Sequence, residues 1–380
     1  MKNNKIKILY QLNQLGYSGT EKAIYTFIKN LNKEKYSVSV FFYTDKGSFN
    51  FYRKKFLSFF IKRYKTSYIQ KYIIGFARKE EFENLIGIEN FYMGDKNKFF
   101  TVCNKLDLDI IHFSRGIEED FYTNSINNLP NDVKIVETSI FGKPSNSNYL
   151  NRLSSIFFVS KWLMNQAKWV DQSKGKVLYL PIPKPITKES FRKRYSIPND
   201  AIILGRISRP YLDDGEFIYE VLNNIIKTNI FYIGIGSSDN LIEKTKNNKN
   251  IIHINPTTDE VELSTFYTTI DILLHYRIEG ETFGMNIADA MIHGKPVVSH
   301  YSSVDNAQAE LILGDKNAGI VVRDNNLSEY VNAIQLLIDN SSLRIEYGQN
   351  AQEKANALYS EDKATKILES YYTKIINKKV

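Results

Sequence analysis

The stretch from Glu279 to Ser299, which reads EGETFGMNIADAMIHGKPVVS, constrains the fold of this chain more than any other. Apolar residues recur at helical spacing in its middle and predict one buried helix face: Ile287, Ala288, Met291 and Ile292. Glycines before this helix let the backbone approach a ligand closely, and a Gly-Lys-Pro sequence ends it. Two valines then begin a strand. A loop, a short helix and a strand in this order are typical of a parallel α/β sheet.

The chemistry of this stretch favours a phosphorylated ligand. The free amides at a helix start, together with the helix dipole, attract an anion. Glu281 stands just before the helix, where a carboxylate can accept hydrogen bonds from sugar hydroxyls beside a phosphate. Asp289 lies off the apolar stripe and can point into a cleft. By pattern alone two interpretations remain open: a ligand site of this kind, or a core helix with a solvated acid at its start.

Three segments of this stretch resemble the signature of the family 4 retaining glycosyltransferases, which have the GT-B fold. They are Glu281-Thr282-Phe283-Gly284, Asp289-Ala290-Met291 and Gly294-Lys295-Pro296-Val297-Val298. The signature reads E-x-F-G, four variable residues, E-A-M and, a few residues later, G-x-P-V-V. The resemblance covers residues 201–340 well and the whole chain thinly.

The resemblance implies roles for these residues. Glu281 becomes a catalytic residue that holds the donor sugar, and the backbone of Thr282, Phe283 and Gly284 holds its phosphate. Asp289 takes the place of a glutamate that holds the ribose. Because Asp289 is one methylene shorter than that glutamate, the preference for a nucleotide base stays open.

The length of the chain predicts two domains, since 380 residues exceed what one hydrophobic core usually serves. Prolines between basic residues mark a linker at Pro181, Pro183, Pro185 and Pro198. We therefore expect an α/β fold of two Rossmann-like domains facing across a cleft, as in GT-B enzymes. Residues 1–183 are predicted to form the acceptor-side domain and residues 184–360 the nucleotide-sugar donor domain. The resemblance implies that residues 361–380 form a helix that crosses back to the first domain.

The N-terminal segment predicts a nucleotide-binding α/β unit. A buried strand from Ile6 to Leu12 is followed by a glycine loop and a helix. Ser18 and Glu21 have the spacing of a capping box at the start of that helix. The loop lacks the G-x-G-x-x-G spacing of a dinucleotide fingerprint. The resemblance implies that Gly19 faces the donor diphosphate, and that Gly16 and Thr20 face the acceptor.

Polar residues end two further strands of the first domain. His112 closes an apolar strand, and Glu137 closes the next one. Open α/β sheets bind ligands at these carboxyl ends, although a single histidine is as often structural. The resemblance implies a catalytic role for His112 and an acceptor-side role for Glu137. Asp107 and Asp109 mimic a D-x-D metal motif, but they precede the apolar run and indicate a solvated strand entrance.

Two arginines are candidates for binding the donor diphosphate. Arg206 matches a Gly-Arg pair that begins the second domain of the resembled family. That family also has a lysine several residues later, where this chain has Asp213-Asp214-Gly215. Arg209 is the best local substitute, because a guanidinium binds phosphate in a bidentate manner. For Arg206 the alternative is a surface ion pair.

A net charge of +8 suggests anionic partners such as nucleotide-sugar phosphates, acidic lipid headgroups or nucleic acid. Residues 51–79 contain nine basic residues and no acid: Arg53, Lys54, Lys55, Lys62, Arg63, Lys65, Lys71, Arg78 and Lys79. An apolar stripe at helical spacing accompanies them. Two interpretations of this basic segment remain open: a helix docking on an anionic membrane, or a helix packed on its domain with a solvated basic face. Nothing else in the chain supports nucleic-acid binding.

The lack of a recognisable targeting signal, together with the cysteine usage, predicts a cytoplasmic protein. It is expected to be either free or peripheral on the inner face of the membrane. Polar residues interrupt any signal-peptide core near the N-terminus, and no apolar run approaches the ~20 residues of a membrane span. Cys103 is the single cysteine, which excludes an intramolecular disulfide and fits a reducing compartment.

The resulting hypothesis is a retaining glycosyltransferase that uses a UDP-, GDP- or ADP-linked sugar. Its acceptor is expected to be a glycan or a lipid-linked glycan, as in polysaccharide biosynthesis. We expect no cofactor and no metal, because the chain shows no convincing ligand cluster. Two alternatives remain: a non-catalytic protein that binds a sugar nucleotide or lipid, and a related GT-B enzyme that inverts configuration or epimerises sugar nucleotides.

Overall fold

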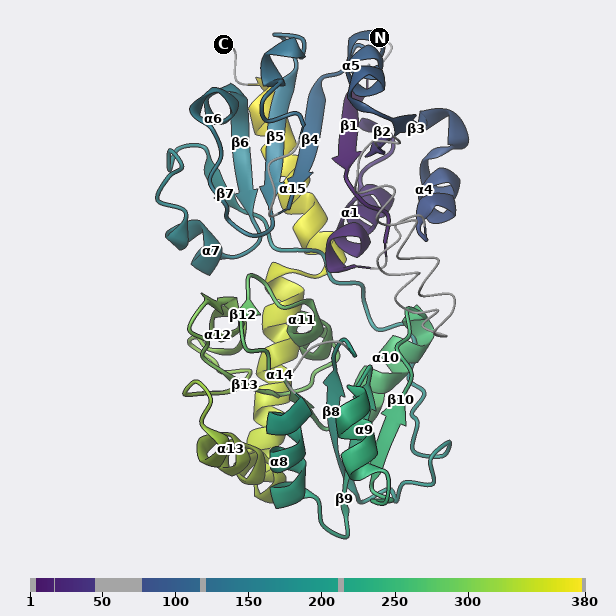
Figure 1. The fold of residues 1–380 in the computed structure, drawn as a ribbon, viewed down its shortest axis with the longest axis vertical. Helices are drawn as coiled ribbons and strands as arrows, with labels where there is room; N and C mark the ends of the chain where they lie inside the picture. Colours follow the sequence, from purple (N-terminus) through teal and green to yellow (C-terminus); the bar gives the residue numbers. More distant parts are fainter. Residues whose placement is uncertain (1–4, 17, 45–76, 117–120, 211–214, 378–380) are drawn as a thin grey trace. The chain divides into compact units, whose positions relative to one another are not determined.

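The computed structural model describes residues 5–16, 18–44, 77–116, 121–210 and 215–377. It contains two compact units, coloured along the chain in Figure 1. The first unit comprises Met1–Pro181 together with Ala364–Val380, and the second comprises Ile182–Lys363. The division falls in the proline-rich segment, and the end of the chain packs with the first unit.

The first unit is built on a seven-stranded parallel sheet in the order β3-β2-β1-β4-β5-β6-β7. The strands are β1 (Ile6–Leu12), β2 (Tyr36–Tyr43), β3 (Phe91–Gly94), β4 (Ile110–Arg115), β5 (Lys134–Ser139), β6 (Leu153–Phe158) and β7 (Gly175–Val177). The α-helices are α1 (Gly19–Asn30), α4 (Lys79–Ile86), α5 (Lys96–Lys105), α6 (Ser147–Arg152), α7 (Lys161–Gln166) and α15 (Glu361–Asn377). The central strands are buried along almost their whole length, as expected of a parallel sheet with covered faces.

One face of this sheet packs against α1 and α15. Ile24 and Phe27 of α1 join Leu368 and Tyr372 of α15 in a single hydrophobic core with the strands. In Figure 1 the yellow α15 runs behind the strands of the first unit. The last helix is therefore part of the N-terminal core, although about 330 residues of sequence separate it from α1.

The second unit is built on a six-stranded parallel sheet in the order β10-β9-β8-β11-β13-β15. Its strands are β8 (Ile202–Ile207), β9 (Ile230–Ile235), β10 (Ile251–Ile254), β11 (Ile272–Leu274), β13 (Val297–His300) and β15 (Gly319–Val322). A two-strand ribbon, β12 (Gly280–Glu281) with β14 (Asp305–Asn306), lies outside this sheet. The helices are α8 (Gly215–Ile225), α9 (Asp239–Thr245), α10 (Glu260–Thr269), α11 (Met285–Ile292), α12 (Ala307–Ile312), α13 (Leu327–Asp339) and α14 (Ser341–Leu358).

The strand order fixes where each sheet can bind a ligand. From β8 the chain adds β9 and β10 on one side, and β11, β13 and β15 on the other. In the first unit the same reversal occurs between β1 and β4. Open parallel sheets bind ligands outside the carboxyl ends of the two strands at such a reversal. The relevant positions are therefore the segments that follow β8 and β11, and those that follow β1 and β4.

Two local expectations require correction or restriction. The Ser18 hydroxyl bonds the Glu21 carboxylate and not a backbone amide, so α1 begins without the predicted capping box.

Of the basic segment 51–79, the structure describes residues 77–79 only. There Arg78 is buried and paired with Glu81, and Lys79 pairs with Glu83, so these two cations are engaged within the fold. The rest of that prediction lies outside the described residues. Within the described part of the chain, no helix is both long enough and apolar enough to cross a membrane.

Candidate active site

The carboxyl ends of β8 and β11 meet the start of α11 through two hydrogen bonds. Arg206, near the end of β8, is 3% exposed and donates from Nη2 to the carbonyl oxygen of Tyr276 at 3.2 Å. Asn286, in the first turn of α11, donates from Nδ2 to the carbonyl oxygen of Ile207 at 3.2 Å. These contacts gather Arg206, the segment after β11 and the start of α11 at one edge of the sheet. It is the edge where the strand order predicts a ligand.

Two glycines shape the turn between β11 and α11. Gly280 has a φ of +69°, and a β-carbon there would lie 1.8 Å from the carbonyl oxygen of Asp305, so a side chain cannot fit. Gly284 has a φ of +98° and is the N-cap residue of α11, with no side chain capping the helix. The first amides of α11 are thus not satisfied by a side-chain cap, which suits an anionic ligand.

The Glu281 carboxylate is held at this turn by one of its oxygens. Oε1 lies 3.4 Å from His275 Nε2 and 3.5 Å from Arg277 Nη1. The backbone amide of Glu281 donates to Oε1 of the buried Gln308 at 3.0 Å. Burial raises the pKa of the Glu281 carboxyl, but His275 and Arg277 more than offset this, and the net pKa lies below its usual value. The structure therefore presents Glu281 as an ionised, partly buried carboxylate.

Sequence reasoning missed three residues of this arrangement: His275, Arg277 and Gln308. His275 immediately follows the apolar strand β11, just as His112 closes the apolar part of its own strand. That pattern, a histidine directly after a buried strand, was the signal that could have identified it. Gln308 offered no such signal, because its contact with Glu281 depends on the pairing of β12 with β14.

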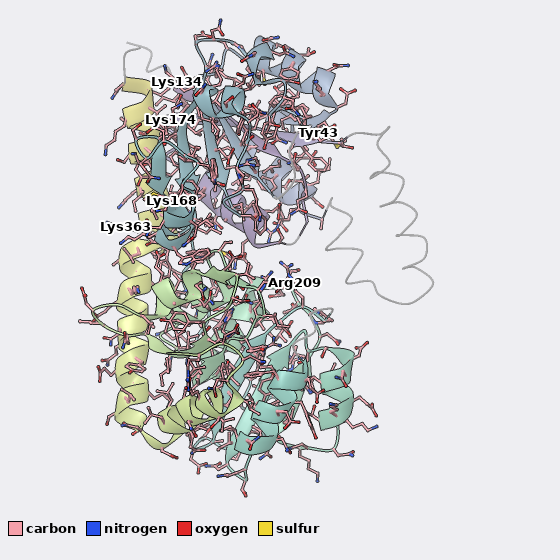
Figure 2. All side chains as sticks on the ribbon, turned by 60° about the vertical axis from the view of Figure 1, so that its left-hand side comes forward. Tyr43, Lys134, Lys168, Lys174, Arg209 and Lys363 are labelled. Atoms are coloured by element: carbon pink, nitrogen blue, oxygen red, sulfur yellow. The ribbon has the colours of Figure 1, made fainter. Side chains whose placement is uncertain are left out.

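The other predicted donor residues lie along α11 and after β8. Asp289 is partly buried in the middle of α11, and it adds to the effect of burial in raising the pKa of the Tyr267 hydroxyl. Phe283 is buried with its ring against Tyr359, so its side chain belongs to the packing of the second unit. Thr282 is partly buried. Arg209 lies at the surface of the second unit, as Figure 2 shows.

His112 is not placed as the sequence suggested. It is 2% exposed, with Nδ1 at 2.5 Å from the Tyr372 hydroxyl and Nε2 at 2.7 Å from Thr138 Oγ1. Its ring stacks on Tyr10 at 4.8 Å. Burial lowers the pKa of His112 to about 3. Both ring nitrogens are engaged within the hydrophobic core, so the catalytic role expected for His112 is corrected to a structural one.

Glu137 is also part of the core of the first unit. Its side chain is fully buried, and Oε2 accepts hydrogen bonds from Arg115 Nε at 3.1 Å and from the Tyr149 hydroxyl at 2.6 Å. The Arg115 guanidinium also donates hydrogen bonds to the carbonyl oxygens of Lys143 and Pro144. A buried charge of this kind is retained because it is paired. The expected acceptor-side role of Glu137 is therefore corrected: it anchors the segment that contains Lys143 and Pro144.

The glycine loop of the first unit follows β1 at the reversal of strand order. Gly16 is buried, Gly19 is the first residue of α1, and Thr20 is partly buried. Burial raises the pKa of the neighbouring Glu21 carboxyl, against the opposing effect of its hydrogen bond with Ser18. These residues belong to the first unit, whereas Arg206, Glu281 and Gly284 are assembled in the second.

The described residues contain no group of three or more histidine, cysteine or acidic side chains that could hold a metal ion. Asp107 and Asp109 both bind Lys7. The Lys7 ammonium donates to Asp107 at 2.9 Å, and the Lys7 backbone amide donates to Asp109 at 2.7 Å. This agrees with their interpretation as a strand entrance. Cys103 is buried.

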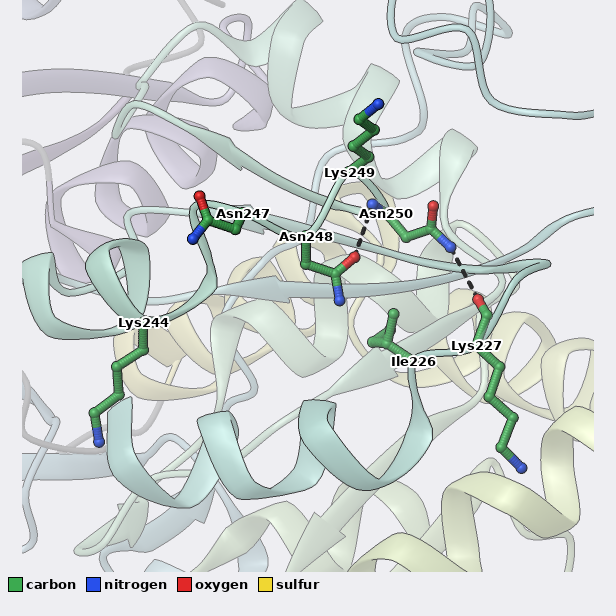
Figure 3. Close-up of a pocket in the computed structure, with 7 residues that line it drawn as sticks. All are labelled: Ile226, Lys227, Lys244, Asn247, Asn248, Lys249 and Asn250. Atoms are coloured by element: carbon green, nitrogen blue, oxygen red, sulfur yellow. Dashed lines mark hydrogen bonds between the residues drawn. The ribbon is translucent and has the colours of Figure 1, made fainter.

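An open depression of about 490 Å³ lies at the other edge of the second sheet (Figure 3). Its lining consists of Ile226, Lys227, Lys244, Asn247, Asn248, Lys249 and Asn250. Asn250 precedes β10, and its amide Nδ2 donates to the Lys227 carbonyl oxygen ahead of β9 at 2.9 Å. The depression therefore marks the amino ends of these strands, opposite the edge that holds Glu281.

Comparison with known proteins relates part of the chain to glycosyltransferases. Residues 220–354 match the family model described as glycosyl transferases group 1. The matched residues all lie within the second unit. An uncharacterized glycosyltransferase of Methanocaldococcus jannaschii is 27% identical over 164 residues, which cover 42% of this chain and 41% of that protein. The match thus spans under half the length of that relative.

Solved glycosyltransferase structures share the fold over nearly the whole chain. A glycosyltransferase from Rickettsia africae has a TM-score of 0.73 and 16% identity, with 99% of this chain and 100% of the other covered. Anabaena HepE, solved in complex with UDP-glucose, has a TM-score of 0.66 and 14% identity, with 97% and 100% covered. Sucrose-phosphate synthase from Thermosynechococcus elongatus has a TM-score of 0.66 and 14% identity, with 98% and 99% covered. The predicted GT-B fold of two Rossmann-like domains is confirmed.

Proposed function

We propose that this protein is a group 1 glycosyltransferase that transfers a sugar from a nucleotide diphosphate donor to a glycan or lipid-linked acceptor, with retention of configuration. The observation that carries the proposal is the Glu281 carboxylate, held through Oε1 beside the uncapped start of α11. A carboxylate suits sugar hydroxyls, and the helix start suits the adjoining phosphate. That HepE was solved with UDP-glucose supports a nucleotide-sugar donor, and the resemblance to family 4 supports retention.

In this proposal the leaving diphosphate is stabilised by fixed donors. Arg206 and Arg209 supply positive charge, and the backbone amides of Thr282 to Gly284 supply hydrogen bonds. Such preorganised groups usually provide the largest part of the rate enhancement. Asp289 is proposed to bind the ribose. The scheme uses neither a metal nor a cofactor, and retaining enzymes of this family need no dedicated general base.

A second candidate function is a non-catalytic sugar-nucleotide or lipid-binding protein. Two observations favour it: aspartate at position 289, and the absence of the family's lysine, whose place in the sequence is taken by Asp213-Asp214-Gly215. This candidate predicts donor binding without turnover. An inverting enzyme or a sugar-nucleotide epimerase is distinguished from a retaining transferase by the anomeric configuration of the product.

A thermal-shift screen across UDP-, GDP- and ADP-linked sugars tests donor binding. We expect one nucleotide class to raise the unfolding temperature, because a ligand at 100 times its Kd stabilises the folded state by about 2.7 kcal/mol. EDTA is expected to leave both the shift and the turnover unchanged. If no class shifts the transition, donor binding is contradicted. A shift that EDTA abolishes contradicts a metal-independent site.

Membrane association is proposed from the sequence of residues 51–79, most of which lie outside the described structure. Cations near an anionic surface contribute about 1 kcal/mol each, screened within a Debye length. We therefore expect salt-sensitive binding to anionic liposomes and little binding to neutral ones. Reversing the charge of Lys54, Lys55, Lys62 and Arg63 to glutamate is expected to release the protein from liposomes while sparing donor binding. If the amount of protein that sediments with liposomes changes neither with salt nor with the charge reversal, docking on the membrane is contradicted.

A further inference from the structure

The two oxygens of the Glu281 carboxylate have different surroundings. Oε1 contacts both His275 Nε2 and Arg277 Nη1, whereas no described residue donates a hydrogen bond to Oε2. The side chain is 21% exposed, so it is neither enclosed nor freely mobile. The backbone is fixed as well, through Gln308 and the pairing of β12 with β14. One oxygen is therefore anchored and the other is left to meet a ligand.

His275 is itself rigidly held. Its backbone amide donates to the Val298 carbonyl oxygen at 2.8 Å, and its own carbonyl oxygen accepts from the Tyr330 hydroxyl at 3.0 Å. Its Nδ1 lies 2.9 Å from Ser299 Oγ. When the Ser299 hydroxyl donates to Nδ1, Nε2 carries a proton and donates it to Glu281. The serine hydroxyl thus selects the tautomer that binds the carboxylate.

The row of Ser299, His275 and Glu281 has the residue types of a nucleophilic triad, but its burial excludes that chemistry. Ser299 has no exposed surface and His275 is 7% exposed, whereas Glu281 is the most exposed member. A nucleophile must reach the substrate. The order is therefore reversed: the carboxylate faces outward, and the histidine and serine support it from inside.

Arg277 contacts the same carboxylate oxygen from the loop. Its Nη1 lies 3.5 Å from Glu281 Oε1, and its Nε lies 3.6 Å from Oε2 of the exposed Glu279. Its backbone amide donates to Nε2 of the buried His300 at 3.2 Å. His300 Nδ1 donates to the Tyr301 carbonyl oxygen at 2.6 Å and lies 3.3 Å from Asp324. These contacts fix the loop backbone, so Arg277 and His275 approach Oε1 from two directions.

We propose that His275 and Arg277 are positioning residues that hold Glu281 by Oε1 and present Oε2 to the donor sugar. The inference rests on the proposed function, because it assigns a substrate contact to Oε2. Neither residue needs to touch the donor. Both act through Glu281, by fixing its rotamer and by favouring its ionised form.

The charge of the Glu281 carboxylate makes the reaction rate depend on pH, and this dependence can test the inference. The charged or titratable groups around Glu281 are His275 and Arg277 in contact with it, Glu279 beyond Arg277, and the pair of His300 and Asp324 behind the loop. His275 and Arg277 lower the pKa of Glu281, so the carboxylate stays ionised to lower pH. Removing either partner must raise that pKa, and the acidic limb of the rate profile must move to higher pH.

The test compares His275→Leu with His275→Gln. The leucine variant loses both ring contacts and is expected to lower kcat on the order of 10- to 100-fold, with a smaller change in KM, because the carboxylate is misplaced. The glutamine variant keeps an amide donor and is expected to recover part of kcat. Arg277→Gln is expected to shift the acidic limb in the same direction.

His253→Leu is the matched control. His253 lies in the same unit and has two hydroxyl partners, Ser237 at 2.9 Å and Thr245 at 2.8 Å, and no carboxylate partner among the described residues. Its loss is expected to lower the unfolding temperature without moving the acidic limb. If the acidic limb of the rate profile shifts as far in His253→Leu as in His275→Leu, the shift results from general destabilisation. That outcome overturns the inference.

The pKa of Glu281 in the ligand-free protein separates this inference from the proposed function. It is measured by nuclear magnetic resonance on protein labelled at the glutamate carboxyl carbon, with Glu281→Gln to identify the signal. A higher pKa in both His275→Leu and Arg277→Gln supports the anchoring, and an unchanged pKa overturns it. If the wild type turns over none of the nucleotide sugars, the proposed function fails, while this titration still decides whether His275 and Arg277 hold Glu281.

Discussion

Replacing Glu281 by glutamine is expected to lower turnover by about 10²-fold or more and to leave the fold intact. Glutamine has nearly the shape of glutamate, and its amide can keep a contact with His275 or Arg277. It cannot carry the negative charge opposite the donor sugar, and its amide nitrogen cannot accept a hydrogen bond from a sugar hydroxyl. The loss should therefore fall mainly on kcat.

Initial rates across donor concentrations, together with the unfolding temperature, measure this effect. Glu279→Gln is the matched control, because Glu279 lies two residues away in the same turn, is exposed and also pairs with Arg277. It is expected to retain most of the wild-type turnover. If Glu281→Gln reacts at the wild-type rate, Glu281 does not belong to the active site.

Replacing Arg206 by alanine is expected to lower kcat/KM by on the order of 10²- to 10³-fold, the usual cost of losing one preorganised donor. Both donor binding and the chemical step should suffer, because the diphosphate gains charge as it leaves. Arg206 also donates to the Tyr276 carbonyl oxygen in a buried setting. Its removal deletes this buried hydrogen bond and should cost about 1–3 kcal/mol of stability.

Two comparisons separate the functional loss from the structural one. Arg206→Lys retains the positive charge but loses the planar fork of donors, so it should lie between the wild type and the alanine variant. Arg209→Ala removes an exposed side chain and should hardly change the unfolding temperature. If Arg209→Ala lowers kcat/KM far more than Arg206→Ala does, the principal diphosphate ligand is Arg209, and the assignment of Arg206 is wrong.

Much of the second unit could be predicted from local sequence. The apolar spacing and the Gly-Lys-Pro end of the stretch 279–299 predict a helix and a following strand, and the structure has α11 at Met285–Ile292 and β13 at Val297–His300. These predictions succeed because helix period, left-handed glycine positions and proline breaks act over a few residues. The position of Glu281 before the helix follows from the same short-range rules.

The two histidines that close apolar strands show where local rules end. His112 and His275 look alike in sequence, yet His112 is enclosed by Tyr372, a residue 260 positions further along the chain. His275 instead meets the partly exposed Glu281 and the buried Ser299. What distinguishes them is the element packed over each strand end, and this depends on long-range packing that no local pattern encodes.

Glu137 shows a second limit, which concerns the two faces of one strand. Consecutive side chains of a strand point to opposite faces, so Glu137 and Thr138 have different neighbours. Thr138 meets His112 on the face covered by α15, while Glu137 meets Arg115 and Tyr149. The sequence by itself determined the α/β class, the turn at Glu281 and the helix that follows it. Only the tertiary structure decided which polar strand ends are buried and paired and which face a ligand, because burial is a property of the assembled layers and not of the strand alone.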